Sequence, residues 1–505
     1  MSRFAKELAQ RQAKGQHRRW LFVPYDQFSD KMGPLAREDP RSLGIVLVEN
    51  TWKPSLRPYH KQKLALILSN LRHFALEQAE RGVAVRHVVA HGPYRDALVP
   101  LISQLGPLRV MVPAERELRM DLQPLVDAGD LLVIPHEGWL TTETQFNTVS
   151  EKSGMWRMDR FYRKVRKDAD LLMESGKPEG GKWSLDAENR RFWNGHPPAP
   201  EPPAFPIDPI KKEVGRLIEE RFGQHPGRLD LQKLPSTQAD AEKLWSWAKR
   251  ECLAMFGPYE DAMSSRSRSL FHTRISALLN LHRLLPHQIL RDVTEMRIPL
   301  ASKEGFIRQV LGWREFVCHI HRETDGFRSL PSGRCPTAIR PGDGGFGRWR
   351  YRKWNFEKCP SFIDGGAMPS FLGCEQPLPS AFWGDPSGLA CLDQVVSEVW
   401  DEGYSHHITR LMVLANVATL LDVSPRELTD WFWVAYTDAY DWVVEPNVLG
   451  MGTYAVGKVM TTKPYVSGAN YIAKMSDYCD QCAFDPKKTC PLTGLYWAFL
   501  SRHRN

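Results

Sequence analysis

The sequence lacks any apolar run long enough to span a bilayer, so it predicts no contact with a membrane. Residues 1–20 are basic but lack the apolar core of a secretory signal, and we therefore expect a cytoplasmic protein. No GxGxxG motif follows the first predicted strand, which excludes the common dinucleotide-binding fingerprint. Nine cysteines, an odd number in a chain of 505 residues, argue against a framework of paired disulfides and favour buried thiols or a metal or cluster site.

The composition that remains is ordinary for a large globular protein. With 42% hydrophobic and 25% charged residues, the chain is long enough for two or three domains. A net charge of +8 favours polyanionic partners such as nucleic acid. Seventeen tryptophans exceed ordinary core needs, and nine of them lie in the C-terminal half, where their rings could stack on a flat cofactor or on bases.

Residues 19–140 alternate short β-rich runs with amphipathic helical runs. The predicted strands are RWLFVPY, LGIVLVEN, VAVRHVV, LRVMVP and DLLVIPH. A long helix ends at Gly82, and a second helix covers YRDALVPLISQLG. This alternation predicts a doubly wound parallel α/β sheet.

The pattern changes after residue 141. MWRMDRFYRKVRKDADLL predicts a basic aromatic helix, and HPPAPEPPAFPIDP predicts an extended Pro-rich linker. Almost everything beyond it has helical apolar spacing. We therefore predict an α/β domain at 1–145, an interdomain linker at 146–235 and an all-α domain at 236–505, with an irregular insert at about 324–375.

Within the insert, GFGRWRYRKWNFEK (345–358) alternates basic and aromatic residues. Such a pattern can hold phosphates and stack on bases, and it is equally typical of a solvated basic loop.

Three cysteines near the C-terminus, Cys479, Cys482 and Cys490, have the spacing of metal or cluster ligands. A fourth ligand would come from one of the six other cysteines. Ligand type alone leaves zinc and an iron-sulfur cluster both open.

Three other stretches are candidates for a site. Arg308 and Arg314 could hold a pyrophosphate, although composition favours an ordinary salt-bridged bundle. His406 and His407 stand side by side in a predicted apolar helix, where a pair suggests proton transfer and a single buried histidine is usually structural. The aromatic stripe 430–442 would by default pack in the core. Alternatively, its rings could form a wall on which a ligand stacks, or they could carry electrons.

Several long motifs, in fixed order, resemble the prokaryotic iron-sulfur photolyase and cryptochrome family, the bacterial (6-4) photolyases. They are EGFIRQVLGWREF, YSHHITRLMVLANVATLL, WVVEPNVLGM, KPYVSGANYIAKMSDYC and CPLTGLYWAFL, preceded by LSNLRHFA, FYRKVRK and PEGGKWSLDAENR. The resemblance implies an N-terminal antenna domain, a helical domain that binds FAD, and a 4Fe-4S cluster held by Cys391, Cys479, Cys482 and Cys490.

The same resemblance assigns further residues by family position. It implies an FAD site at Tyr259, Ser276, Leu278, Asn280, Glu304, Phe306, Arg308, Trp313, Arg314, His407, Arg410 and Asp438. It also implies a lesion pocket at His407, His406, Tyr465, Tyr471 and Met451, electron transfer through Trp431 and Trp383, and a 6,7-dimethyl-8-ribityllumazine antenna near Glu49, Trp52 and Lys53.

The implied activity is blue-light repair of (6-4) photoproducts in UV-damaged DNA by a monomer, with the lesion flipped out of the duplex and with His407 as proton donor. The alternatives are a photosensory cryptochrome without repair activity and a nucleic-acid binder with a structural cluster. Two departures from the family pattern bear on this choice: a short loop between Cys482 and Cys490, and Val444 with Glu445 in WVVEPN where members have WVELPN.

Overall fold

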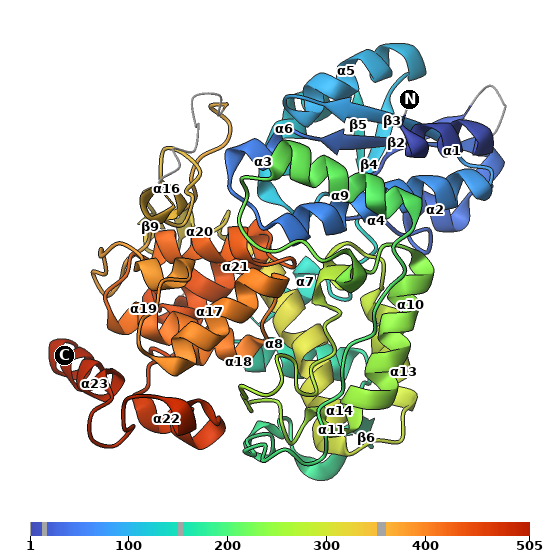
Figure 1. Cartoon of the computed structure of the whole chain (residues 1–505). Helices are drawn as coiled ribbons and strands as arrows, with labels where there is room; N and C mark the ends of the chain where they lie inside the picture. Colours follow the sequence, from blue (N-terminus) through green and yellow to red (C-terminus); the bar gives the residue numbers. More distant parts are fainter. Residues whose placement is uncertain (1, 13–17, 150–154, 351–359, 505) are drawn as a thin grey trace.

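The structure is a computed structural model that describes residues 2–12, 18–149, 155–350 and 360–504. It consists of an N-terminal α/β domain and a larger helical part (Figure 1). None of the helices in the described residues is long and apolar enough to cross a membrane.

Five parallel strands form the sheet of the α/β domain, in the order β3-β2-β1-β4-β5. Their bounds are β1 Arg19–Phe22, β2 Leu43–Asn50, β3 Ala84–Ala90, β4 Leu108–Met111 and β5 Leu131–Ile134. Every residue of β2 is buried, as expected of a parallel strand covered on both faces. The five predicted strands and the doubly wound sheet are confirmed.

Crossover helices connect the strands because parallel neighbours cannot be joined by a tight turn. The helices of this part are α1 Arg3–Arg11, α2 Gly33–Arg37, α3 Lys53–Leu56, α4 Lys61–Glu80, α5 Tyr94–Leu105, α6 Arg116–Asp127 and α7 Glu143–Asn147. The long helix α4 stops just before Gly82, which has a φ of +90° that favours glycine.

The segment 146–235, predicted as a linker, contains two helices, α8 Met158–Asp168 and α9 Pro209–Phe222. Helix α9 returns to the α/β domain and packs against α4 (Figure 1). Arg72 on α4 joins α9 to the sheet. The Arg72 guanidinium contacts Glu213 of α9 at 2.7 Å and Glu49 of β2 at 2.8 Å.

The remaining residues form a helical part, as predicted, with long irregular segments at 257–275 and within 324–389. Their helices are α10 Gln238–Trp247, α11 Leu253–Phe256, α12 Ser276–Asn280, α13 Pro286–Glu295, α14 Leu300–Ile307, α15 Glu315–Glu323, α16 Phe346–Trp349, α17 Ala390–Glu402, α18 His407–Thr409, α19 Asn416–Leu420, α20 Pro425–Ala435, α21 Asp441–Val444, α22 Ala469–Met475 and α23 Pro491–Arg502. Two short hairpins, β6 Met173–Glu174 with β7 Lys177–Pro178 and β8 Ser329–Leu330 with β9 Gly333–Arg334, complete the elements.

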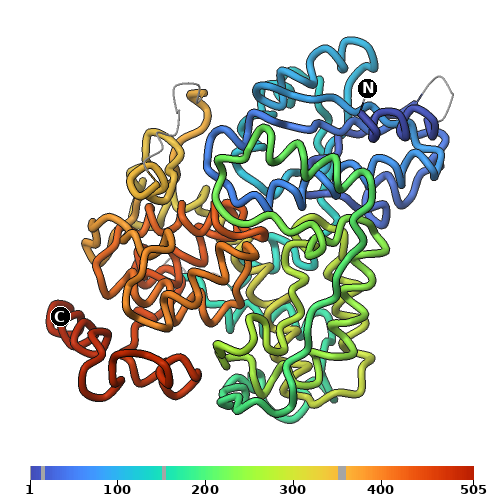
Figure 2. The backbone as a smooth tube through the Cα atoms, viewed as in Figure 1, coloured from blue at the N-terminus to red at the C-terminus, as the bar shows by residue number. Residues whose placement is uncertain are grey.

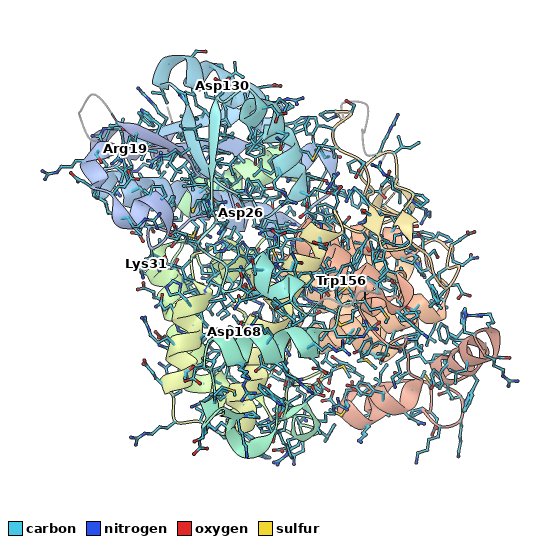
Figure 3. All side chains as sticks on the ribbon, turned by 180° about the vertical axis from the view of Figure 1, so that it is seen from behind. Arg19, Asp26, Lys31, Asp130, Trp156 and Asp168 are labelled. Carbon is cyan, nitrogen blue, oxygen red and sulfur yellow. The ribbon has the colours of Figure 1, made fainter. Side chains whose placement is uncertain are left out.

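One continuous hydrophobic core runs from the sheet into the helical part. The start of α4 is fixed on α20, because the His60 amide donates to the Val434 carbonyl at 2.7 Å. Figure 3 shows Asp26, which follows β1, at this junction of the two parts. The C-terminal helices lie at the edge of the helical part, on the side away from the N-terminus (Figure 2).

Candidate functional site

A polar cavity of about 560 Å³ opens between α4, the Pro-rich segment and the end of α17. One wall is the segment 265–269, which alternates serine and arginine. The polar side chains that line the cavity include Ser265, Arg266, Ser267, Arg268, Ser269, Arg274, Ser276, Lys233 and Glu402. Clustered guanidinium, ammonium and hydroxyl groups are the donors that bind phosphate, so the cavity suits an anionic ligand.

Glu402 holds the cations of this cavity in place. Its carboxylate contacts Lys233 at 2.6 Å, Arg274 at 2.5 Å and Arg268 at 3.0 Å. Burial opposes its charge, but Arg274 and Lys233 outweigh burial and lower the pKa of Glu402 to about 2. The carboxylate therefore stays ionised and keeps the cationic side chains oriented at the cavity.

Behind the cavity wall, Ser276 is joined to three further residues that sequence analysis assigns to the FAD site. The carboxylate of Asp438 accepts two hydrogen bonds from Arg410, both at 3.0 Å, and one from Ser276 Oγ at 2.6 Å. Asn280 donates to the Asp438 carbonyl at 2.9 Å. Although burial disfavours the charge, Arg410 lowers the pKa of Asp438, so a fixed ion pair stands behind Ser276 at the cavity wall. Leu278 lines the same cavity.

The other predicted FAD residues lie outside this cavity lining, in separate groups. Tyr259 stacks on Phe271 and donates its hydroxyl to the His196 carbonyl at 3.0 Å. Glu304 and Arg308 pair with each other at 3.6 Å, and Phe306 packs edge-to-face on Phe256.

Trp313 and Arg314 form a third group. Trp313 contacts Phe316, and the Arg314 guanidinium lies 4.2 Å from the Trp139 ring centroid and 3.1 Å from Glu315. Of the twelve residues predicted for FAD, the structure therefore places Ser276 and Leu278 in the cavity lining, and it joins Asp438 to Ser276, Asn280 and Arg410 behind that lining.

Three π-helical segments carry several of the predicted site residues. They span Arg308–Arg314, Arg410–Ala415 and Glu445–Gly452. A π-bulge inserts a residue into a helix and turns nearby side chains to a new face, which is why such bulges are frequent at functional sites. No apolar spacing in the sequence signals them.

Three histidines gather beside Arg410. His406 stacks on His272 with ring centroids 4.4 Å apart and planes 10° apart, and His407 meets His272 at 5.4 Å. Their ligating atoms lie within 4.8 Å of one another. A trio of this size could hold a metal ion, or its members could take part in proton transfer.

Only one of these histidines is open to solvent. Burial lowers the pKa of both His272 and His406 well below the usual value, so both rings are neutral near pH 7. His407 has 41% of its side chain exposed, and its Nε2 lies 3.8 Å from the Asp261 carboxylate. The helix α18 begins at His407, and His406 is the extended residue before it, which corrects the prediction that both lie in a helix.

The two tyrosines predicted for the lesion pocket lie near the carboxylates of Asp261 and Asp186. Tyr471 is hydrogen-bonded to Asp261, and burial raises the pKa of its phenol. Tyr465 is 38% exposed and lies near Asp186, whose carboxylate pairs with Arg308 at 3.1 Å. Met451 is half-buried in the π-helical segment 445–452.

The four predicted cluster cysteines come from two distant stretches and meet in space. Cys391 is the second residue of α17, Cys479 and Cys482 lie in or next to the turn Tyr478–Gln481, and Cys490 caps α23. Burial, with the neighbouring Cys479, Cys490 and Cys482, raises the pKa of Cys391 to about 12. Four thiolates there would repel one another, so the group needs a bound cation to ionise.

Cysteine thiolates hold both zinc and iron-sulfur clusters, so the four thiols suit either kind of centre. The short loop 482–490 closes through Asp485, whose side chain accepts from the amides of Lys487 and Lys488.

The residues predicted for the antenna divide between two charge clusters. Glu49 is tied to Arg72 and His87 inside the α/β domain. Lys53 instead contacts Tyr25 and Glu115, at the C-terminal ends of β1 and β4. That edge is the switch point of the sheet, where open α/β folds bind ligands. Asn50 accepts from the amides of Trp52 and Lys53, and this holds both residues at the same edge.

The insert packs on the aromatic stripe. Gly344 approaches α20 so closely that a Cβ there would lie 2.5 Å from the Trp431 Cα, and its φ is +61°. Most of the basic-aromatic run 345–358 lies outside the described residues. Trp383, just after the insert, donates its Nε1 proton to the Gly344 carbonyl at 2.8 Å.

Glu445, displaced by one position from the family pattern, is buried away from the cavity. Its carboxylate contacts His321 at 3.0 Å and Arg426 at 2.8 Å. Val444 beside it is a buried core residue.

Sequence analysis did not identify His272, Asp261, the arginines of 266–274 or the cavity role of the Pro-rich segment. The alternation of serine and arginine in SSRSRS was the one available signal, since it combines two phosphate-binding residue types. His272 and Asp261 carried no local signal, because their partners lie far along the chain.

Comparison with known proteins gives consistent matches. The model of the family "Deoxyribodipyrimidine photo-lyase-related protein" matches residues 21–234. A (6-4) photolyase from Agrobacterium fabrum is 32% identical over 497 residues, which are 95% of this chain and 90% of that protein.

Two solved structures share the fold. A bacterial class III photolyase from Agrobacterium tumefaciens has a TM-score of 0.54 at 14% identity, over 90% of this chain and 82% of that one. A cryptochrome from Synechocystis sp. PCC6803 has a TM-score of 0.55 at 14% identity, over 86% and 82% of the two chains. With nearly full-length identity above 30% to one of its members, the chain belongs to the photolyase and cryptochrome family, among the deoxyribodipyrimidine photo-lyase-related proteins.

Proposed function

We propose that the protein is a blue-light-driven (6-4) photolyase that binds FAD in the polar cavity and repairs UV-damaged DNA. The observation that carries the proposal is the position of Arg410. It forms an ion pair with Asp438, whose carboxylate also accepts from the cavity residue Ser276, and it follows His406 and His407 by one helical turn. Arg410 therefore links the solvent-open His407 to a residue of the cavity lining through Asp438.

The cavity residues fit the parts of the cofactor. The serine and arginine side chains of 265–274 offer donors for a pyrophosphate, and Ser276 with Asp438 and Asn280 offers polar groups for the flavin ring. When bound and reduced, FAD would supply an electron to the lesion under blue light. A 6,7-dimethyl-8-ribityllumazine antenna near Lys53 and Trp52 is part of the same proposal.

His407 is the proton donor in this proposal. It is the one exposed member of the histidine trio, and its Nε2 lies 3.8 Å from the Asp261 carboxylate. His406 and His272 stay neutral and stack on each other beside it. Tyr465, Tyr471 and Met451 would line the pocket that receives the flipped-out lesion.

We also propose that Cys391, Cys479, Cys482 and Cys490 hold a 4Fe-4S cluster. The raised pKa values of Cys391 and Cys479 come from burial and from the neighbouring cysteines, which supports one centre held by the four thiols, and the family resemblance favours iron-sulfur over zinc. The cluster would join α17, which ends at the cavity residue Glu402, to the C-terminal helix α23.

The test is repair of two duplex oligonucleotides, one with a single (6-4) lesion and one with a single cyclobutane dimer. We expect loss of the (6-4) lesion under blue light and none in the dark, with the dimer untouched. If the protein repaired the cyclobutane dimer alone, its substrate would be the dimer and not the (6-4) lesion. A flavin that photoreduces while both lesions persist would establish the photosensory alternative, and a purified protein without flavin would refute the proposal.

A further inference from the structure

The two tryptophans expected to carry electrons, Trp431 and Trp383, are both sealed from solvent. Trp431 is 0% exposed and Trp383 is 1% exposed. The insert covers Trp383, because Phe346 packs on its ring at 5.3 Å. A path that ends on either ring would leave the positive charge buried, where it is costly.

A third tryptophan lies between them. Trp400, near the end of α17, stacks on Trp383 with centroids 4.7 Å apart and planes 20° apart. It meets Trp431 edge-to-face at 5.8 Å. Trp400 is therefore in ring contact with both of the other indoles.

Trp400 is also the ring of the three that reaches solvent. It is only partly buried, and it lines an open groove of about 600 Å³ between α17, the turn 381–386 and the loop 223–227. Asp385, Asp393 and Asp401 line the same groove, together with Arg350 and His225, so acidic residues outnumber the one arginine there. Water and nearby anions both stabilise a positive charge on a ring at this position.

The hydrogen bonds of the indole N–H groups determine whether an oxidised tryptophan keeps its proton. Trp400 Nε1 and Trp431 Nε1 both donate to the Phe382 carbonyl, at 2.9 and 3.0 Å. A carbonyl oxygen accepts a hydrogen bond but does not take up the proton. An oxidised Trp400 would therefore keep its proton and remain a radical cation until an electron reaches it.

We propose that Trp400 is the middle and exit residue of the electron path that serves the flavin, an inference that rests on the proposed function. One electron passes from Trp400 to the oxidised Trp431, which restores Trp431 and leaves the charge on Trp400, shared with its stacked neighbour Trp383. A small water-soluble one-electron donor then reduces Trp400 from the groove and is itself oxidised. No proton moves in either step.

The first test compares flavin photoreduction in wild type, Trp400→Phe and Trp349→Phe, with ascorbate as donor. Trp349 is a matched control because it is also partly buried and hydrogen-bonded to a carbonyl, but it has no ring contact with Trp431 in the described structure. We expect Trp400→Phe to bind FAD and lose most of its photoreduction, while Trp349→Phe keeps the wild-type rate. Equal rates in wild type and Trp400→Phe would overturn the inference.

A second measurement does not depend on turnover or on any variant folding. Wild-type protein is illuminated without a donor and digested, and oxidised tryptophans are mapped by mass spectrometry. We expect oxidation at Trp400, suppressed by ascorbate and absent in the dark. Oxidation at Trp383 or Trp349 with Trp400 intact would place the exit elsewhere. A wild type that shows no photoreduction at all would instead refute the proposed function.

Discussion

The buried carboxylate of Glu445 gives a stability prediction whose size follows from its surroundings. It is 1% exposed, and it contacts His321 at 3.0 Å and Arg426 at 2.8 Å. Burial opposes its charge, but His321 and the arginines lower the pKa of Glu445 from 4.5 to about 2. That shift corresponds to about 3 kcal/mol of stability at pH 7. The loss expected from breaking a buried ion pair, about 3–5 kcal/mol, agrees with it.

Glu445→Gln should therefore lower the free energy of unfolding by about 3 kcal/mol at pH 7. For 505 residues that unfold as one unit, the unfolding entropy is about 1 kcal/mol/K, so the melting temperature should fall by about 3 °C. A smaller unfolding unit would show a larger shift.

The pH dependence has a definite sign. Because the folded-state pKa of Glu445 lies below its unfolded value, the stabilisation is complete above about pH 4.5 and is lost as the pH falls towards 2. The difference between wild type and variant should therefore shrink below pH 4.5. Thermal melts at pH 7 and pH 3 test this. Glu219→Gln is the control, because Glu219 is 53% exposed in its pair with Lys61. This substitution should lower the free energy of unfolding by at most about 0.5 kcal/mol. Equal melting of Glu445→Gln and wild type at pH 7, or a deficit unchanged at pH 3, would refute the reasoning.

Three further predictions concern the cluster, the flavin and α17. Anaerobically purified wild type should contain about four irons per chain, and Cys391→Ala should lose them while Cys252→Ala keeps them; zinc in place of iron would contradict the cluster assignment. Trp431→Phe should keep FAD but slow its photoreduction, because a phenyl ring is harder to oxidise than an indole; an unchanged rate would remove Trp431 from the path. Glu398→Gln should stabilise the protein above pH 7 by about 3 kcal/mol and have no effect below pH 4.5, because burial raises the pKa of Glu398 to about 7 and its charging opposes folding; a variant less stable than wild type at pH 8 would contradict this.

Much of the fold follows from local pattern. The five strands were predictable because each β-rich run is short and bounded by turns, and α4 ends where Gly82 permits a positive φ. Helix α9 was hidden inside the predicted linker, since the Pro-rich run before it has no periodicity and its docking depends on Arg72, far along the chain.

The site was predictable to a lesser extent. Ser276, Asn280, Arg410 and Asp438 meet in the structure, but this meeting depends on long-range hydrogen bonds that no local pattern encodes. The stacking of His272 on His406 and the position of Trp400 between two buried indoles likewise arise only when distant helices pack. The π-helical segments change which face a side chain occupies, and apolar spacing does not report them.

The most direct test of the account is blue-light repair of a single (6-4) lesion by wild type and by His407→Ala, with both proteins loaded to the same FAD content. The account predicts that wild type repairs the lesion, and that His407→Ala binds the same DNA but repairs it about a hundredfold more slowly or worse, because its proton donor is gone. Equal repair by the two proteins would contradict the role of His407. An intact lesion in the wild-type reaction, with the flavin fully photoreduced, would contradict the repair function itself.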